Sequence, residues 1–215
     1  MLALLAVVSL GGCHAAQTGG QPQIVQPGAP GQATRVISAE KATDLSRVQF
    51  TPADVQFMQG MIGHHAQALE MAALLPDRSR RDDMRLLATR IEVSQADEIQ
   101  MMQRWLEARG QQVPGPHAHH APGAPLMPGM LTAEEMSHLA GARGDAFDRL
   151  FLELMIKHHE GALTMVKALY STAGAGQESE IYAFASDVDA DQRMEIDRMR
   201  GMLGMPATTS KEHER

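Results

Sequence analysis

Residues 57–71 read FMQGMIGHHAQALEM, and residues 151–165 read FLELMIKHHEGALTM. The two stretches share Phe, Met, Ile, a His-His pair, Ala, Leu and Met at the same relative positions. Agreement over stretches of this length indicates an internal repeat. We therefore expect one structural unit that the chain uses twice.

Each stretch has the apolar spacing of a packed helix. Intervals of four and three residues alternate along the series Phe57, Met61, His64, Ala68, Met71 and Leu75, and the second copy repeats them in Phe151, Met155, His158, Ala162, Met165 and Leu169. Such a seam faces a partner helix. The first helix is expected over residues 52–75 with Thr51 as its N-cap, and the second from its cap Asp145 to the glycines that follow residue 173.

Each repeat helix is followed by a second helical pattern. We expect these helices over residues 79–109 and 177–202, and their equivalent seams contain polar residues: Gln95, Glu98, Gln192 and Glu195. Thr132 and Glu135 form a capping box that predicts a short helix before the second repeat. Two helical hairpins with one apolar seam each predict an all-α fold, a four-helix bundle.

The composition changes along the chain define its expected organisation. Residues 1–13 form an apolar run ending at the only cysteine, Cys13, which predicts a lipoprotein signal peptide with a lipidated Cys13, although the run lacks the usual basic residues before it. An ordinary signal peptide is the alternative. Residues 14–45 are expected to be a flexible Gln/Gly/Pro tether, 46–205 the bundle (repeats 50–110 and 131–205, linker 111–130), and 206–215 a disordered tail.

These features predict an extracytoplasmic, periplasmic protein held by a lipid anchor to a membrane, the outer membrane included. The formal net charge of −7 argues against nucleic acid as a partner. The folded part has no activated Ser, no reactive Cys and no phosphate-binding glycine loop, so we expect no enzymatic activity. Because the single cysteine lies in the leader, a site for a soft metal must use Met and His, which number 16 and 10.

The histidine pairs are the first candidate metal ligands. His64 and His158 are expected to face inward toward Glu98 and Glu195, where a purely structural hydrogen-bond network with Gln95 and Gln192 is the alternative. The second members of the pairs are expected nearer the edge, with thioethers beside them, and are the better ligands: His65 and His159 with Met58, Met61 and Met155.

The linker supplies a second set of candidates. Its His and Met residues could capture a soft ion, or the linker could have no role: His117, His119, His120, Met127 and Met130. Thioether and neutral imidazole favour Cu(I). Iron is the second candidate and is less favoured. A di-iron bundle places Glu three residues before each His, and this chain has Met61 and Met155 at those positions instead.

The duplicated Phe-x-x-x-Met-Ile-x-His-His motif, followed by Gln-x-x-Glu-Ile-x-x-Met at Gln95–Met102 and Gln192–Met199, resembles the DUF305 family. The resemblance covers about residues 50–205. It implies an exported bacterial protein with a ferritin-like four-helix bundle and, as in some members, periplasmic copper binding and copper resistance. The histidines that match the family motif are His64, His65, His158 and His159.

Three hypotheses for the function follow. The first is a membrane-tethered protein that sequesters or transfers Cu(I), or Ag(I), with metal ions and periplasmic copper chaperones or efflux components as partners. The second is a ferritin-like dinuclear metalloenzyme that uses His64, His158, Glu98 and Glu195. The third is a structural or stress-interaction bundle without metal.

Overall fold

The computed structural model describes residues 24–26, 34–40, 49–115, 117–118 and 126–205, and it divides the chain into two compact units, residues 1–47 and 48–215. In the first unit, strands β1 (Ile24–Gln26) and β2 (Arg35–Ile37) pair antiparallel, with Val25 opposite Val36. Both strands lie within residues 14–45, for which a flexible tether was expected, and their β-branched residues favour strands. The leader with Cys13 and the tail 206–215 lie outside the described residues.

The first half of the second unit is a helical hairpin of α2 (Pro52–Ala73) and α3 (Asp82–Ala108), joined by the 3-10 helix η1 (Leu75–Asp77). The predicted start of α2 is confirmed. The Thr51 hydroxyl accepts a hydrogen bond from the Asp54 N–H at 3.3 Å, and the Asp54 carboxylate accepts one from the Thr51 N–H at 2.7 Å. These two bonds satisfy N–H groups that a helix start would otherwise leave unpaired.

The ends inside this hairpin differ from the prediction by two or three residues. α2 ends before Leu75 because Pro76 disfavours the α conformation in the residue before it, and the chain continues in the tighter η1. α3 begins at Asp82 instead of residue 79, with Asp82 and Asp83 in the first turn, where carboxylates stabilise a helix. Gly110, with φ of +63°, ends α3 as expected.

The second half contains α4 (Ala133–Gly141), α5 (Gly144–Ser171) and α6 (Ser179–Met202). The predicted capping box of α4 is confirmed, with bonds of 3.2 and 2.9 Å between Thr132 and Glu135. α5 begins one residue before its expected cap, Asp145, and α6 begins at Ser179, where the Glu178 carboxylate accepts a hydrogen bond from the Ile181 N–H. The second hairpin therefore copies the first.

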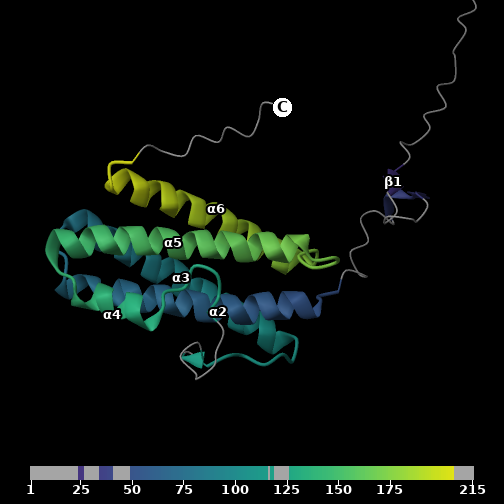
Figure 1. Ribbon diagram of the computed structural model, residues 1–215. Coiled ribbons are helices and arrows are strands. Elements are labelled where there is room, and N and C mark those ends of the chain that lie inside the picture. Colours follow the sequence, from purple (N-terminus) through teal and green to yellow (C-terminus); the bar gives the residue numbers. More distant parts are fainter. Residues whose placement is uncertain (1–23, 27–33, 41–48, 116, 119–125, 206–215) are drawn as a thin grey trace, which may run out of the picture. The chain divides into compact units, whose positions relative to one another are not determined.

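The two hairpins assemble into the expected four-helix bundle (Figure 1). α2 packs along α3, α5 packs along α6, and α2 and α5 join the hairpins through their mutual contact. Two clusters of buried apolar residues fill the interior, one around Phe57 and Phe184 and the other around Phe147 and Phe151. The first cluster holds the N-terminal part of α2 and the C-terminal part of α5, and the second holds their opposite parts.

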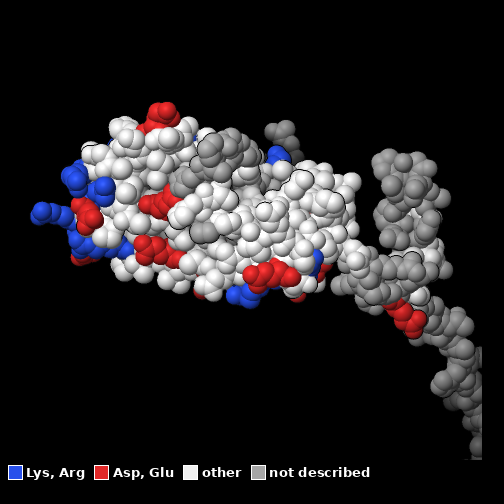
Figure 2. All heavy atoms as spheres, turned by 90° about the horizontal axis from the view of Figure 1, so that it is seen from below, with Lys and Arg blue, Asp and Glu red and all other residues white. Residues whose placement is uncertain are grey.

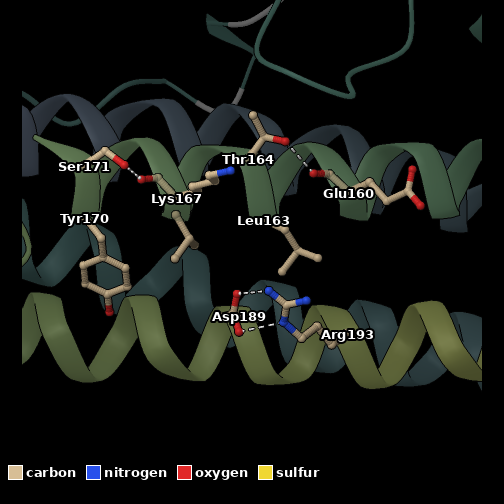
Figure 3. A pocket seen from close by; sticks show the side chains of 9 residues that line it. Glu160, Leu163, Thr164, Lys167, Tyr170, Ser171, Asp189 and Arg193 are labelled. Atoms are coloured by element: carbon tan, nitrogen blue, oxygen red, sulfur yellow. Dashed lines mark hydrogen bonds and ion pairs between the residues drawn. The ribbon is translucent and has the colours of Figure 1, made fainter. Parts of the chain in front are cut away.

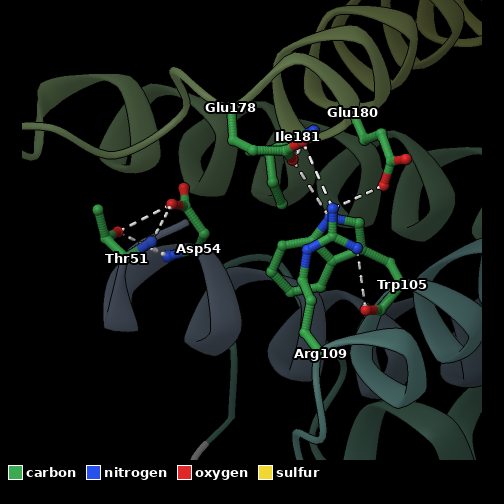
Figure 4. Close-up of polar contacts among 7 residues, drawn as sticks. All are labelled: Thr51, Asp54, Trp105, Arg109, Glu178, Glu180 and Ile181. Carbon is green, nitrogen blue, oxygen red and sulfur yellow. Dashed lines mark hydrogen bonds and ion pairs between the residues drawn. The ribbon is translucent and has the colours of Figure 1, made fainter. Parts of the chain in front are cut away.

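One end of the bundle is closed by polar contacts between the two hairpins (Figure 4). The Arg109 guanidinium lies 4.3 Å from the Trp105 ring centroid and contacts Glu178 at 3.4 Å and Glu180 at 2.8 Å. On the neighbouring helix start, the Asp54 carboxylate accepts a hydrogen bond from the Gly176 N–H at 2.7 Å. Because these contacts connect α2 and α3 with the start of α6, they fix the hairpins against each other.

The surface carries both charges in small groups. On the face drawn in Figure 2, Lys and Arg lie beside Asp and Glu, with uncharged surface between the groups. Among the described residues, no helix combines the length and the apolar character that crossing a membrane requires.

Candidate metal centre

A layer of buried polar residues separates the two apolar clusters of the bundle. It consists of His64, His65, Gln95, Glu98, His158, His159, Gln192 and Glu195. On α2 this layer follows the residues of the first cluster and precedes those of the second, and α5 shows the reverse order. A polar layer between two apolar clusters costs free energy unless its groups find partners, so its contacts decide what it can do. We call it the polar layer.

The two histidine pairs have the same local geometry. Within each pair the ring centroids lie 6.2 Å apart with an angle of 57° between the planes. The rings of His64 and His158 lie against each other across the α2–α5 contact, with centroids 3.8 Å apart. This agreement indicates a pseudo-twofold axis that passes between His64 and His158.

The glutamates bind the second histidine of each pair. Glu98 Oε2 lies 2.5 Å from His65 Nε2, and Glu195 Oε2 lies 2.5 Å from His159 Nε2. We expected Glu98 and Glu195 to contact His64 and His158, and that prediction is wrong. Successive helical residues point about 100° apart, so His64 faces α5 while His65 turns to its own hairpin partner, α3.

The expected position of His65 and His159 near the edge of the bundle is also wrong. Both side chains have no exposed surface, and the three methionines expected beside them are buried as well: Met58, Met61 and Met155. The polar layer is thus enclosed by thioethers and aliphatic side chains on described residues. An ion reaches these groups only if part of the bundle opens.

His64 and His158 are neutral at ordinary pH. Burial lowers the pKa of His64 to about 3, and the neighbouring His65 contributes in the same direction. Burial, followed by the proximity of His64, holds the pKa of His158 well below its usual range. Two imidazoles that stay neutral keep their lone pairs available to a metal ion.

The hydrogen bonds of His64 define its tautomer. His64 Nε2 lies 3.1 Å from the Pro128 carbonyl oxygen, which can only accept, so Nε2 carries the hydrogen and Nδ1 carries the lone pair. His64 Nδ1 has no hydrogen-bond partner. The other partnerless buried atoms of the polar layer are His65 Nδ1, both nitrogens of His158, His159 Nδ1, both amide atoms of Gln95 and Gln192 Oε1. Unpaired buried nitrogens of this kind are rare in proteins and suit a ligand role.

A segment of the linker covers His64. We call residues 127–131 the strap. The Met130 N–H donates to the Met127 carbonyl at 3.1 Å, and Gly129 has φ of +78°, so Pro128 and Gly129 occupy the central positions of a type II turn. The Gln67 side chain donates to the Leu131 carbonyl at 3.0 Å and accepts from the Leu131 N–H at 2.7 Å. The strap is therefore fixed to α2.

The strap also touches the backbone of α5. A Cβ atom on Gly161 would lie 2.0 Å from the Pro128 carbonyl oxygen, and one on Gly129 would lie 2.6 Å from the Lys157 carbonyl oxygen. Only glycine permits an approach this close. The sequence reasoning missed Gln67, Pro128, Gly129 and Gly161. A comparison of the repeats offers a signal, because Gln67 and Gly161 occupy equivalent positions and differ.

The linker residues proposed as ligands take different positions. Met130 is only 5% exposed and Met127 is half-buried, so the linker is less open than we expected. His117 lies on the surface, with its Nδ1 3.8 Å from Glu70 Oε1. His119 and His120 lie outside the described residues.

The structure does not assemble the ligand set of the dinuclear alternative. Among the described residues, no three side chains of His, Cys, Asp or Glu gather in an arrangement that could hold a metal ion. That alternative needs Glu98 and Glu195 as ligands together with His64 and His158. In the structure these glutamates bind His65 and His159 instead. A soft monovalent ion makes smaller demands, because imidazole and thioether ligands suit it. The facing pair His64 and His158 therefore fits such an ion better than a di-iron centre.

Asp191 is a further polar residue near the glutamates that the sequence reasoning missed. Burial raises its pKa, and the carboxylates of Glu98 and Glu195 contribute in the same direction. Its equivalent in the first repeat is Ser94, whose hydroxyl donates to Glu98 Oε1 at 3.3 Å. The two repeats thus differ beside their glutamates.

An open groove of about 590 Å³ lies between α5 and α6 (Figure 3). Tyr170, Lys167 and Glu160 border it on α5, and an Asp189–Arg193 ion pair borders it on α6. None of the paired histidines lines this groove. It is separate from the polar layer.

Comparisons with known proteins place this geometry in a family. The sequence model described as "Domain of unknown function (DUF305)" matches residues 54–203. A DUF305 fragment from Deinococcus radiodurans is 35% identical, with a TM-score of 0.61, over 72% of this chain and 97% of that one. A DUF305 protein from Streptomyces coelicolor, described as a "putative secreted protein", is 31% identical, with a TM-score of 0.60, over 73% of this chain and 97% of that one.

The third similar structure is CopM in its Cu(I)-bound form, which is 26% identical with a TM-score of 0.55 over 73% of this chain and 97% of that one. CopM has also been solved with Cu(II) and with Ag bound. A comparison with curated proteins found no match. The family match spans most of the chain and includes the helices that carry both histidine pairs, so this protein belongs to the DUF305 family.

Proposed function

We propose that this protein binds copper as Cu(I) outside the cytoplasm and sequesters it or transfers it to another protein. The observation that carries the proposal is the pair His64 and His158, two neutral imidazoles in contact at the centre of the polar layer, with three ring nitrogens that have no partner. A structural network would satisfy these nitrogens. One lone pair on each imidazole, at His64 Nδ1 and at one of the two His158 nitrogens, is instead available for a soft cation.

The surrounding residues favour a soft monovalent ion. Burial of His64 and His158 between two apolar clusters disfavours their protonation, which would otherwise compete with the metal. The thioethers of Met61 and Met155 lie at equivalent positions, one helical turn before the histidines, and supply neutral sulfur in the apolar clusters on either side of the polar layer. Neutral sulfur and nitrogen ligands select Cu(I) over hard divalent cations.

Hydrogen bonds orient the second histidine of each pair. Glu98 and Glu195 each contact the Nε2 of their histidine, which fixes the ring and directs Nδ1 away from the carboxylate. We assign these glutamates a positioning role. The protein then acts as a carrier without catalysis, and copper is its cargo.

The relatives support the same class of cargo. CopM, which shares the fold, has been solved with Cu(I), Cu(II) and Ag bound. We extend this to the present chain because both histidine pairs lie within the matched residues. The partners we propose are periplasmic copper chaperones or efflux components that would deliver or receive the ion.

Location at a membrane surface forms part of the proposal. The apolar run that ends at Cys13 supports export and lipidation of that cysteine. Mass spectrometry of the N-terminal peptide from membrane fractions checks this, with Cys13→Ser as the comparison. Release of the unmodified protein from membranes by a high-salt wash would contradict the anchor.

The test of copper binding is an anaerobic titration with Cu(I) against a chromophoric competitor. We expect stoichiometric retention by the wild type and loss of that retention in His64→Asn/His158→Asn, with X-ray absorption reporting nitrogen and sulfur neighbours. The control His138→Asn removes an exposed histidine that belongs to none of the candidate sites and is expected to retain the ion. Circular dichroism checks that each variant is folded. Equal retention by the folded core variant would overturn the assignment.

A further inference from the structure

Two methionines, Met127 of the strap and Met165 of α5, approach Gly60 of α2, one helical turn before His64. A Cβ atom on Gly60 would lie 3.3 Å from Met127 Sδ and 3.4 Å from the Met165 methyl carbon. Met127 Sδ and the Met165 methyl group therefore both approach the point where Gly60 lacks a side chain. The missing side chain at Gly60 leaves a recess that the ends of these two methionines fill.

This recess lies in line with His64. Gly60, His64 and Gln67 are spaced by four and three residues, so they share one face of α2. The strap follows this face: Met127 lies over Gly60, the Pro128 carbonyl binds His64, and Leu131 binds Gln67. One helical turn therefore separates the two thioethers from an imidazole whose Nδ1 has no partner.

We propose that Met127 and Met165 form an outer site, below the partly exposed strap, that takes up Cu(I) or Ag(I) and supplies it to His64. The proposal rests on the proposed function, since it names the route to the same buried site. Two neutral thioethers bind soft monovalent cations and discriminate against hard ones. The Glu98 and Glu195 carboxylates of the polar layer contact His65 and His159, and the atoms nearest to the Cβ position of Gly60 belong to the two methionines.

Exposure decreases along the proposed route. Leu126, which precedes the strap, is 54% exposed, Met127 is half-buried, Met165 is 8% exposed and His64 is buried. An ion on the thioethers reaches His64 when the strap moves, which requires the bond between His64 Nε2 and the Pro128 carbonyl to open. The strap then carries one ligand of the outer site and covers the inner one.

The part of the chain that the structure describes holds this site once. The second repeat has Leu154 at the position of Gly60, and the linker that supplies Met127 is present in a single copy. Duplication of the hairpin therefore does not duplicate the recess. One uptake site per chain is expected.

The experiment uses the full chain labelled with ¹³C at its methionine methyl groups and titrated with silver nitrate in chloride-free buffer. We expect the methyl resonances of Met127 and Met165 to shift during the first equivalent of Ag(I), with assignments from single Met→Leu variants. In Met127→Leu/Met165→Leu, which keeps the apolar volume, loading of the protein is expected to slow by about tenfold, the effect of roughly one lost ligand contact. Met101→Leu/Met194→Leu, at two exposed positions, is the matched control and is expected to load at the wild-type rate.

The outcomes separate this proposal from the function. Retention of Ag(I) by the wild type, with silent Met127 and Met165 methyl groups and unchanged loading of the double Leu variant, would overturn the uptake site and leave the core site standing. Response of both methyl groups without retention at His64 and His158 would support the uptake site and overturn the core site. Gly60→Ala places a Cβ against both thioethers and is expected to weaken the first Ag(I) response in a folded protein.

Discussion

The Gln67 side-chain amide binds the Leu131 backbone through two hydrogen bonds, donating to its carbonyl at 3.0 Å and accepting from its N–H at 2.7 Å. All of these atoms are buried. An amide in this arrangement replaces the pairing that a neighbouring strand would give to the strap. It connects residues 64 positions apart in the chain and holds the strap over His64.

Replacement of Gln67 by Ala is expected to destabilise the protein by about 1–3 kcal/mol, because both backbone groups of Leu131 lose their buried partner. Urea unfolding measures the change. Gln59→Ala is the control on the same helix, since Gln59 makes one exposed hydrogen bond to the Gln112 carbonyl, and its expected effect is below about 0.5 kcal/mol. Equal effects of the two substitutions would show that the strap is not fixed by Gln67.

Replacement of Gly161 by Ala is expected to displace the strap. The new Cβ would lie 2.0 Å from the Pro128 carbonyl oxygen, and backbone cannot yield as a flexible side chain can. Hydrogen exchange of the Leu131 N–H should accelerate. In the control Gly201→Ala, nothing lies within 4 Å of the new Cβ on helix α6, so stability should rise by about 0.5–1 kcal/mol. Unchanged exchange at Leu131 in Gly161→Ala would contradict the contact.

Glu98→Ala and Glu195→Ala are expected to cost about 3 kcal/mol each, since each leaves a buried imidazole without its partner. The equivalence of the repeats predicts similar values for the two, measured by denaturant unfolding. Glu153→Ala on α5 removes a carboxylate from an exposed ion pair with Arg149, for which we expect a loss below about 1 kcal/mol. A small loss at either buried glutamate would count against a shared role.

The stability of the metal-free protein should fall as the pH decreases below about 6.5. The unfolded histidines bind protons near pH 6.5, whereas burial lowers the pKa of His64 to about 3 and that of His158 well below its usual value. The unfolded state therefore binds more protons in this window, and each of the two histidines contributes a slope of about 1.4 kcal/mol per pH unit.

Unfolding by urea at several pH values between 6.5 and 5 measures this slope. The variant His64→Gln/His158→Gln should show a shallower pH dependence, whereas His117→Gln/His138→Gln, at two exposed positions, should keep the wild-type slope. Parallel curves for the core variant and the wild type would show that these histidines protonate in the folded state.

The sequence predicted the bundle well because its signals are local. The seam spacing that begins at Phe57, the cap at Thr51 and the capping box at Thr132 each depend on residues within a few turns. The helix ends that were predicted wrongly depend on competition between the α-helix and other local conformations. At Pro76, for example, a 3-10 helix replaces the last expected turn of α2. The strands at Val25 and Val36 were not predicted, because these two short β-branched segments lie within a Gln/Gly/Pro-rich region whose composition is typical of a tether.

The candidate site was predicted less well because burial does not define direction. Periodicity placed His64 and His65 on adjoining rows, but it could not say which helix each would meet, and the glutamate pairing was assigned to the wrong histidine. The strap could not be predicted from periodicity, since the contact between Pro128 and Gly161 depends on the packed positions of α2 and α5. That contact becomes visible only in three dimensions.

The linker breaks the symmetry about the pseudo-twofold axis between His64 and His158. The strap is present once and lies beside this axis. It therefore approaches the equivalent positions 67 and 161 from different directions and cannot bond to both in the same way. Gln67 binds the strap through two hydrogen bonds, and Gly161, at the equivalent position of the second repeat, lacks the side chain that would clash with it. The single linker therefore requires different residues at two positions that the repeat makes equivalent, and the strap covers one side of the pseudo-twofold axis only.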